Sequence, residues 1–179
     1  MKITIGSRLV SALIALTFTS ALLAQDKPRA SPAMTSSGTT KGVTIKISYS
    51  SPGVKGRKIW GELVPYNKVW RAGANEATLI TIDKDILVEG KPLRAGTYSL
   101  YAIPGETEWV VIFNSATGQW GIKPDGTTTE DPAKDVFRVT VKPVDCPEFN
   151  ERLIYMVDAD GFSLYWDKLR VPIPISVGN

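Results

Sequence analysis

Apolar and polar residues alternate along most of the chain beyond residue 42, which is the pattern of β-strands. In Val43–Tyr49, every second residue is apolar and the residues between them are polar. The same alternation recurs in Thr97–Ile103, Asp135–Val141 and Leu169–Ile175. A period of two places alternate side chains on opposite faces of a strand, so each segment is expected to bury one face and expose the other.

Further short apolar runs are bounded by turn-forming residues, as strands usually are. An example is the hairpin turn Asp158–Gly161, which separates two such runs. No segment beyond residue 24 keeps a helical period for ten residues. Eight or nine strands in residues 43–179 therefore predict an all-β domain, either an antiparallel β-sandwich or a jelly-roll-like barrel. The additional strands are expected at 77–82, 86–88, 109–113, 152–157 and 162–166.

The last expected strand, Leu169–Ile175, contains two prolines two residues apart, Pro172 and Pro174. Residues two apart direct their backbone groups to the same side of a strand, and proline has no N–H to donate. We therefore expect this strand to form a sheet edge whose open side carries the two prolines.

The first 24 residues have the composition of a signal peptide. Lys2 and Arg8 precede an apolar stretch, Leu9–Ala24, that is too short, and is followed by too polar a flank, for a membrane span. We expect cleavage after Ala24, or alternatively after Ala21, and export to the periplasm or the medium with no membrane span left. Residues 25–42, rich in Ser, Thr, Pro, Ala and Gly, are expected to be a flexible lead-in.

Composition excludes several chemistries. The chain has no histidine and a single cysteine, Cys146, so it cannot form a Ser-His-Asp triad, a His-ligated metal site or an intramolecular disulfide. We expect no metal and no cofactor. Loss of Lys2 and Arg8 with the signal peptide would leave 19 basic and 18 acidic residues. Such a near-neutral chain is not expected to bind nucleic acid.

The connection Ser51–Thr78 is too long for a simple turn and carries most of the candidate chemistry. One interpretation is a lid in which Trp60, Val64, Tyr66 and Trp70 pack over one end of the sandwich, with Arg71 paired to Glu76. The other is a ligand pocket with an apolar wall at Trp70 and Tyr66 and fixed donors at Arg71 and Asn75. The candidate ligand-binding residues are Arg57, Lys58, Tyr66, Trp70, Arg71, Asn75, Glu76 and, from the second long loop at 115–134, Trp120.

Long ordered motifs in this chain resemble a known bacterial family. They include RKIWGELVPYNKVWRAGANEAT at 57–78, VEGKPLRAGTYSL at 88–100 and LYWDKLRVPI at 164–173. The chain is similar to the family of domain of unknown function 2911 from about Gly42 to Ile175. The resemblance implies an exported protein of the cell envelope with a β-rich domain, and it implies no activity.

Three classes of function are compatible with these observations. A non-catalytic binding module would hold a small anionic or polar ligand, a glycan or a protein partner at the loop end of the sandwich. An enzyme lacking histidine would have to use carboxylates or lysine, with Glu62, Glu76 and Lys68 as the nearest candidates. A structural or assembly protein of the envelope would expose an apolar patch without a cleft. We expect the binding module and predict no catalytic residues.

Overall fold

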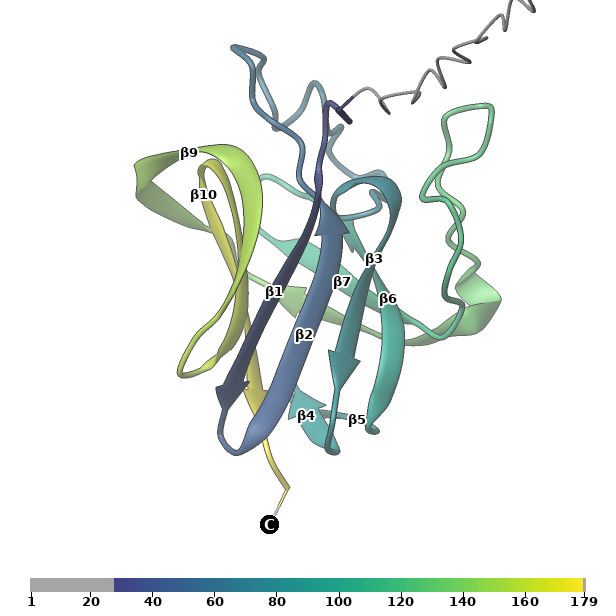
Figure 1. Ribbon diagram of the computed structural model, residues 1–179, viewed down its shortest axis with the longest axis vertical. Helices are drawn as coiled ribbons and strands as arrows, with labels where there is room; N and C mark the ends of the chain where they lie inside the picture. Colours follow the sequence, from purple (N-terminus) through teal and green to yellow (C-terminus); the bar gives the residue numbers. More distant parts are fainter. Residues whose placement is uncertain (1–27, 179) are drawn as a thin grey trace, which may run out of the picture.

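The computed structural model describes residues 28–178 and shows two antiparallel sheets packed into a β-sandwich (Figure 1). The predicted all-β sandwich is therefore confirmed. The only helical element in the described chain is the 3-10 turn Pro132–Lys134. The six-stranded sheet has the order β1 (Ala33–Thr40), β2 (Val43–Ser50), β3 (Ala74–Ile82), β6 (Gly96–Ile103), β7 (Trp109–Asn114), β8 (Asp135–Val141); the four-stranded sheet has the order β5 (Lys91–Leu93), β4 (Ile86–Val88), β10 (Gly161–Ser176), β9 (Val144–Val157).

The core lies between the two sheets and is filled by the alternating apolar positions. In β2, Val43, Ile45 and Ile47 are fully buried, whereas the residues between them are exposed. Trp109 and Trp166 are among the largest buried side chains. Burying large apolar side chains supplies most of the favourable free energy of folding, because each contributes about 1.5–3 kcal/mol.

The expectation of a flexible lead-in at 25–42 is wrong from residue 33 onward. Residues Ala33–Thr40 form β1, which pairs along its whole length with β2. Most side chains of β1 are exposed and polar, so the hydrophobic alternation that reveals other strands is absent. Gly38 lies against the four-stranded sheet, where an added Cβ would be 2.8 Å from Val157 Cβ. Backbone pairing and this close approach, rather than apolar side chains, hold β1 in place.

The expectation that Leu169–Ile175 is an edge strand is also wrong. It is part of β10, which extends continuously from Gly161 to Ser176 and lies between β4 and β9. The pairing with β9 ends at Arg170, and the pairing with β4 begins at Ile175. Pro172 and Pro174 lie between these two ladders, so prolines here require only a local gap in the hydrogen bonding.

The loop 115–134 packs over the outer face of the six-stranded sheet, seen beside β6 in Figure 1. Gln119 Nε2 donates to Tyr101 Oη at 2.8 Å, and Tyr101 is fully buried although it faces away from the main core. The loop therefore covers a second, smaller apolar cluster. Among residues 28–178, no helix is long and apolar enough to cross a membrane.

Candidate functional site

Four tryptophans from distant parts of the chain meet at one end of the core. Trp60 makes edge-to-face contacts with Trp70, Trp109 and Trp166, with ring centroids 4.9–6.0 Å apart. Trp70 and Trp166 are nearly parallel, at 6.0 Å and 15°. Such contacts stabilise beyond simple area burial, by about 0.5–1.5 kcal/mol per pair. Trp60 and Trp70 are therefore lid residues that pack on the core, as one of the two interpretations of the connection predicted.

A cavity of about 200 Å³ lies beside this aromatic cluster. It is formed where the segment before β1, the connection between β2 and β3, and β10 come together. The connection extends from the end of the sandwich at which β1 begins (Figure 1). Its lining residues are Ser31, Pro52, Arg57, Leu63, Val64, Trp70, Arg71, Gly73, Ala74 and Trp166.

Arg71 is one of two arginines that line this cavity, and neither pairs with a described acidic residue. Its side chain makes no hydrogen bond or ion pair with any residue in 28–178, and its Nε is buried without a partner. Burial lowers the pKa of Arg71 below its usual value, because a partly desolvated guanidinium is less favourable than a hydrated one. The guanidinium still carries its charge at neutral pH, because arginine is not deprotonated in proteins.

The backbone around Arg71 is fixed on both sides. Trp70 and Ala102 exchange two backbone hydrogen bonds of 2.7 and 2.9 Å. The carbonyl of Ala72 accepts hydrogen bonds from Thr78 Oγ1 at 3.0 Å and from Tyr155 Oη at 2.8 Å. The start of the Arg71 side chain is therefore held by rigid strands rather than by a free loop.

Arg57 is the second cation that lines the cavity, and it is held by backbone carbonyls. Its Nε donates to Val54 O at 3.1 Å, and one terminal nitrogen donates to Gly53 O at 2.6 Å. The other terminal nitrogen makes no hydrogen bond to a described residue. None of the described residues that line the cavity is acidic, so its electrostatic environment favours an anion.

Glu76 does not pair with Arg71, which corrects the ion pair proposed for the packed-lid interpretation. Glu76 instead accepts from Arg29 at 2.7 Å and from Ser50 Oγ at 3.2 Å. The hydrogen bond from Arg29 is the main cause that lowers the pKa of Glu76. Asn75 Nδ2 donates to the carbonyl of Ser31 at 3.1 Å. Asn75 and Glu76 thus fasten the segment before β1 at the rim of the cavity and do not line it.

The other predicted ligand-binding residues lie outside the cavity. Lys58 is exposed and pairs with Glu62 at 3.2 Å. Tyr66 packs against Gly61, where a Cβ would be 3.0 Å from the ring. Trp120 is 49% exposed and pairs with Glu76 through a backbone bridge. The structure therefore brings together Arg57, Trp70 and Arg71 from the predicted set.

Two lining residues that the sequence did not predict are Trp166 and Ser31. Trp166 comes from β10, far along the chain, and its Nε1 is buried without a partner. The sequence predicted a strand at 162–166 but not which cavity Trp166 would line. Ser31 belongs to the segment interpreted as a flexible lead-in, and no sequence signal placed it.

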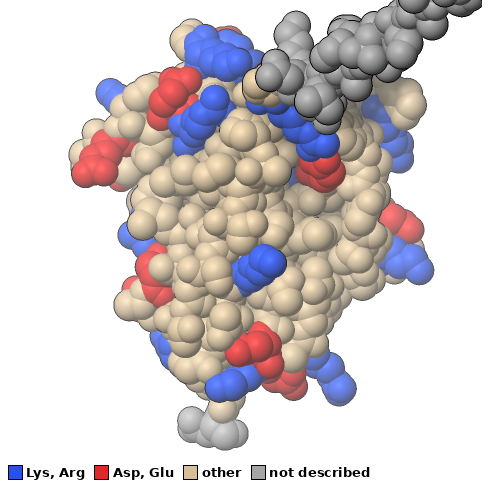
Figure 2. All heavy atoms as spheres, viewed as in Figure 1, with Lys and Arg blue, Asp and Glu red and all other residues tan. Residues whose placement is uncertain are grey.

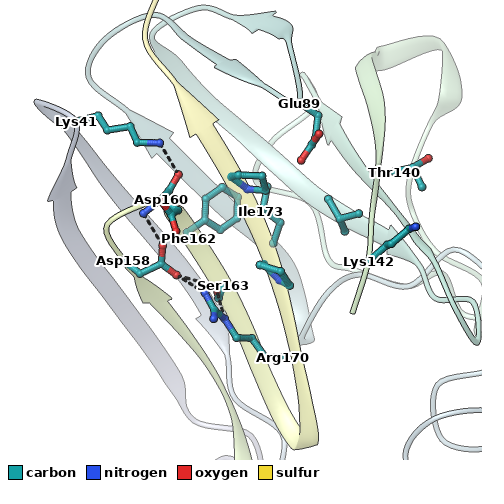
Figure 3. A pocket seen from close by; sticks show the side chains of 13 residues that line it. Lys41, Glu89, Thr140, Lys142, Asp158, Asp160, Phe162, Ser163, Arg170 and Ile173 are labelled. Carbon is teal, nitrogen blue, oxygen red and sulfur yellow. Dashed lines mark hydrogen bonds and ion pairs between the residues drawn. The ribbon is translucent and has the colours of Figure 1, made fainter. Parts of the chain in front are cut away.

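A larger cavity, of about 510 Å³, lies between β8 and β10 (Figure 3). Its central charges are already satisfied within the protein. Arg170 bonds Asp158 at 3.1 Å, and Ser163 Oγ donates to the same carboxylate at 2.8 Å. Lys41 Nζ donates to the carbonyls of Asp160 and Ile175 at 3.2 and 2.6 Å. A ligand there would have to displace these bonds, so size alone does not make this groove the better site.

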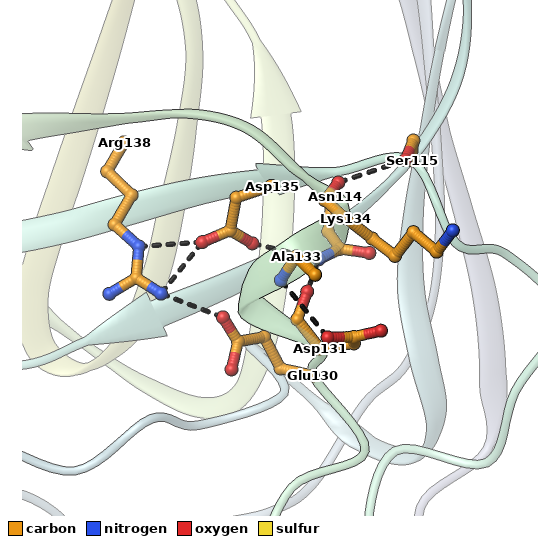
Figure 4. Close-up of polar contacts among 8 residues, drawn as sticks. All are labelled: Asn114, Ser115, Glu130, Asp131, Ala133, Lys134, Asp135 and Arg138. Carbon is orange, nitrogen blue, oxygen red and sulfur yellow. Dashed lines mark hydrogen bonds and ion pairs between the residues drawn. The ribbon is translucent and has the colours of Figure 1, made fainter.

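A close carboxylate pair occurs elsewhere, at Glu130 and Asp135 (Figure 4). Arg138 bonds both, at 2.9 and 2.7 Å, and Asn114 Nδ2 donates to Asp135 at 2.8 Å. Neither carboxylate lines the Arg71 cavity. In the part of the chain that the structure describes, no group of three or more Cys, Asp or Glu could hold a metal ion.

Charged side chains of both signs are spread over the surface of the sandwich. On the face drawn in Figure 2, most of them lie toward the two ends, and the middle, over β1 to β3, is mainly uncharged. The cavity that contains Arg71 differs from this face, because two arginines and no described acidic residue line it.

Comparison with known proteins identifies the family but no activity. The family model described as "Protein of unknown function (DUF2911)" matches residues 31–175. No curated protein and no solved structure matches the chain. The matched range includes β1 and ends near the end of β10, so it covers both sheets and the Arg71 cavity. The chain therefore belongs to the DUF2911 family of proteins of unknown function.

Proposed function

We propose that this protein is a non-catalytic binding module for a small anionic ligand, held in the cavity that contains Arg71. The observation that carries the proposal is that the Arg71 guanidinium lines a cavity without an acidic residue and makes no hydrogen bond to residues 28–178. Folded proteins satisfy nearly all buried donors, and the remaining exceptions require an explanation. The buried donor here is Arg71 Nε, and an anion beside the terminal nitrogens would compensate the charge of the same guanidinium.

Desolvation of Arg71 gives an energetic reason for it to bind an anion. An arginine that loses water without gaining a partner destabilises the fold, because the lost hydration is not replaced. A carboxylate or another oxyanion would replace it with two charge-assisted hydrogen bonds to the planar fork of the guanidinium. Part of the binding free energy would therefore come from satisfying a donor that the fold leaves open.

The site of action in this proposal is outside the cytoplasm. It rests on the tripartite pattern of residues 1–24, which lie outside the described residues. N-terminal sequencing of the protein isolated from the envelope or the medium tests it. The expected first residue is Gln25, and a retained Met1 would contradict export with cleavage.

Thermal unfolding with added anions tests the binding proposal. A ligand that binds only the folded state raises its stability by RT ln(1 + [L]/Kd). We expect acetate, phosphate or benzoate, compared at constant ionic strength, to raise the melting temperature of the wild type but not of Arg71→Lys. Lys58→Gln is the matched control, because Lys58 is an exposed cation on the same connection. Equal increases in all three proteins would show a general salt effect and contradict the proposal.

A further inference from the structure

We propose a second binding site, for a neutral sugar, on the outer face of the six-stranded sheet beside the exposed ring of Trp120. The site combines this ring with an open groove of about 320 Å³ over β1, β2 and β3. No described residue lines both this groove and the Arg71 cavity, so the inference goes beyond the proposed anion site and does not depend on it.

The Trp120 side chain is 49% exposed, although the backbone that carries it is fixed. Backbone hydrogen bonds of 3.1 and 2.9 Å join the residues on either side of it to β3. Trp120 and Glu76 are thereby directly opposite each other in an antiparallel pair that exchanges no hydrogen bond of its own. Side chains of such a pair leave the same face and lie close together. A ligand can therefore contact an aromatic ring whose position is largely set in advance.

Glu76 links the Trp120 ring to the groove, which it lines. Its carboxylate accepts from Arg29 at 2.7 Å and from Ser50 Oγ at 3.2 Å, and the side chains of Arg29 and Glu76 remain 55% and 46% exposed. The guanidinium offers further donors and the carboxylate further lone pairs. An ionic ligand would gain little from this pair, because each charge already has a partner. A neutral ligand that both donates and accepts hydrogen bonds suits it.

The floor of the groove adds hydroxyl groups and an apolar side chain. Thr35 of β1 lies opposite Ser48 of β2, and Ser48 lies opposite Leu79 of β3. Since the neighbouring Ile47 is buried in the core, this row of side chains is on the outer face of the sheet. The hydroxyls of Thr35 and Ser48 make no hydrogen bond to any residue in 28–178, so both can donate to and accept from a ligand.

A sugar ring presents the groups that match this surface. Its hydroxyls donate and accept hydrogen bonds, and its C–H groups form apolar faces that can pack against an indole ring. The surface over β1 to β3 is mainly uncharged (Figure 2), which favours a neutral ligand over an ionic one. The groove has roughly twice the volume of a cavity that holds benzene, and thus has room for a sugar ring with its hydroxyls.

Isothermal titration calorimetry of the mature chain tests this inference with three neutral trisaccharides, cellotriose, maltotriose and chitotriose. We expect at least one of them to bind in a saturable way. Mannitol, which carries hydroxyls but no ring, should not bind measurably. Trp120→Ala is expected to weaken the bound trisaccharide by at least about tenfold, because the ring that packs against the sugar is removed. Phe149→Ala is the matched control, since Phe149 is 53% exposed and does not line the groove.

A second variant tests the floor of the groove. Ser48→Ala removes one hydroxyl from the outer face and should weaken the same trisaccharide severalfold. Ser37→Ala is its control, because Ser37 is an exposed residue of β1 that does not line the groove. Melting curves establish that each variant is folded, and Ser48→Ala keeps the proposal testable if Trp120→Ala does not fold.

The outcomes separate this inference from the proposed function. Binding of none of the three trisaccharides, or binding that neither Trp120→Ala nor Ser48→Ala weakens, would overturn the sugar site. The Arg71-dependent stabilisation by acetate is measured on the same proteins and should persist in Trp120→Ala. Its absence from the wild type would contradict the anion site and leave the sugar site standing.

Discussion

Gly121 lies directly against the side chain of Arg71, and a Cβ added to this glycine would overlap Arg71 Cδ. The same Cβ would be 2.8 Å from the backbone carbonyl of Asn75, which accepts a 2.9 Å hydrogen bond from Gly121 N–H. The backbone at Trp120 and Gly121 thus supports the aliphatic part of the Arg71 side chain. The loop at 115–134 contributes to the site through this glycine rather than through the Trp120 ring.

Gly121→Ala is expected to displace Arg71 and to destabilise the fold by roughly 1–3 kcal/mol, as overpacking does. Anion-induced stabilisation should be lost with it. Urea unfolding with and without benzoate measures both effects. Gly178→Ala is the control, because an added Cβ there meets nothing within 4 Å. A Gly121→Ala protein with wild-type stability and binding would show that Gly121 does not position the Arg71 side chain.

The two hydroxyls that hold the Ala72 carbonyl are expected to act together. Burial raises the pKa of Tyr155, so its hydroxyl stays protonated and can donate. Tyr155→Phe and Thr78→Val should each cost about 1 kcal/mol of unfolding free energy, the usual net value of one hydrogen bond. The double variant should lose more than the sum, since it leaves a buried carbonyl without either donor. Urea unfolding of the wild type, the two single variants and the double variant measures these losses. Strictly additive losses would contradict the claim that the two hydroxyls hold the Ala72 carbonyl together.

Asp158 is expected to stabilise the fold at neutral pH. Burial alone would raise the pKa of Asp158, but hydrogen bonds from Ser163 Oγ and from two backbone N–H groups, together with the charge of Arg170, lower it below its usual value. A carboxyl whose pKa is lowered on folding stabilises above its unfolded pKa, about 3.9, and this stabilisation is lost as the pH falls through the folded pKa. Asp158→Asn should therefore cost roughly 1–3 kcal/mol at pH 7 and less at pH 3, by urea unfolding. An equal loss at both pH values would contradict the assignment.

Glu130 is expected to show the opposite pH dependence. Burial and the nearby charge of Asp135 raise the pKa of Glu130, and the attraction of Arg138 only partly offsets them. Such a group favours the fold most below its unfolded pKa, about 4.3, and this contribution is lost as the pH rises through the folded pKa. Glu130→Gln, which keeps an acceptor for Arg138, should therefore become less destabilising or more stabilising between pH 4 and pH 7. If it instead loses stability over this range as Asp158→Asn does, the carboxylate at Glu130 is a net stabiliser and the raised pKa is wrong.

The sequence predicted those strands in which apolar and polar side chains alternate between the core and the surface. In β2 and β8, apolar residues face the core at alternate positions, so the period of two is visible. β1 was missed because its exposed polar side chains carry no such signal and its place is set by backbone pairing with β2. The prolines of β10 indicated missing hydrogen bonds correctly but not that the gap would be local.

Only the part of the candidate site that lies in the connection 51–78 was predictable from the sequence. The density of aromatic and cationic residues in 51–78 indicated Trp70 and Arg71, which do line a common cavity. The proposed pairing of Arg71 with Glu76 relied on closeness in sequence, whereas Glu76 lies in β3 and pairs with Arg29. Trp166 and Ser31 reach the cavity through sheet topology, which sequence spacing does not show.

Whether Arg71 is a free anion-binding group is tested most directly by following the Nε–H signals of arginine by NMR in the mature protein, with Arg71→Lys identifying the Arg71 signal. Titration with benzoate should move the Arg71 signal in a saturable way. The signals of Arg138 and Arg170 should stay in place, because their Nε groups already donate to Asp135 at 2.7 Å and to Ser163 at 3.1 Å. An Arg71 signal that does not move with benzoate, acetate or phosphate would contradict the proposal that this cavity binds an anion.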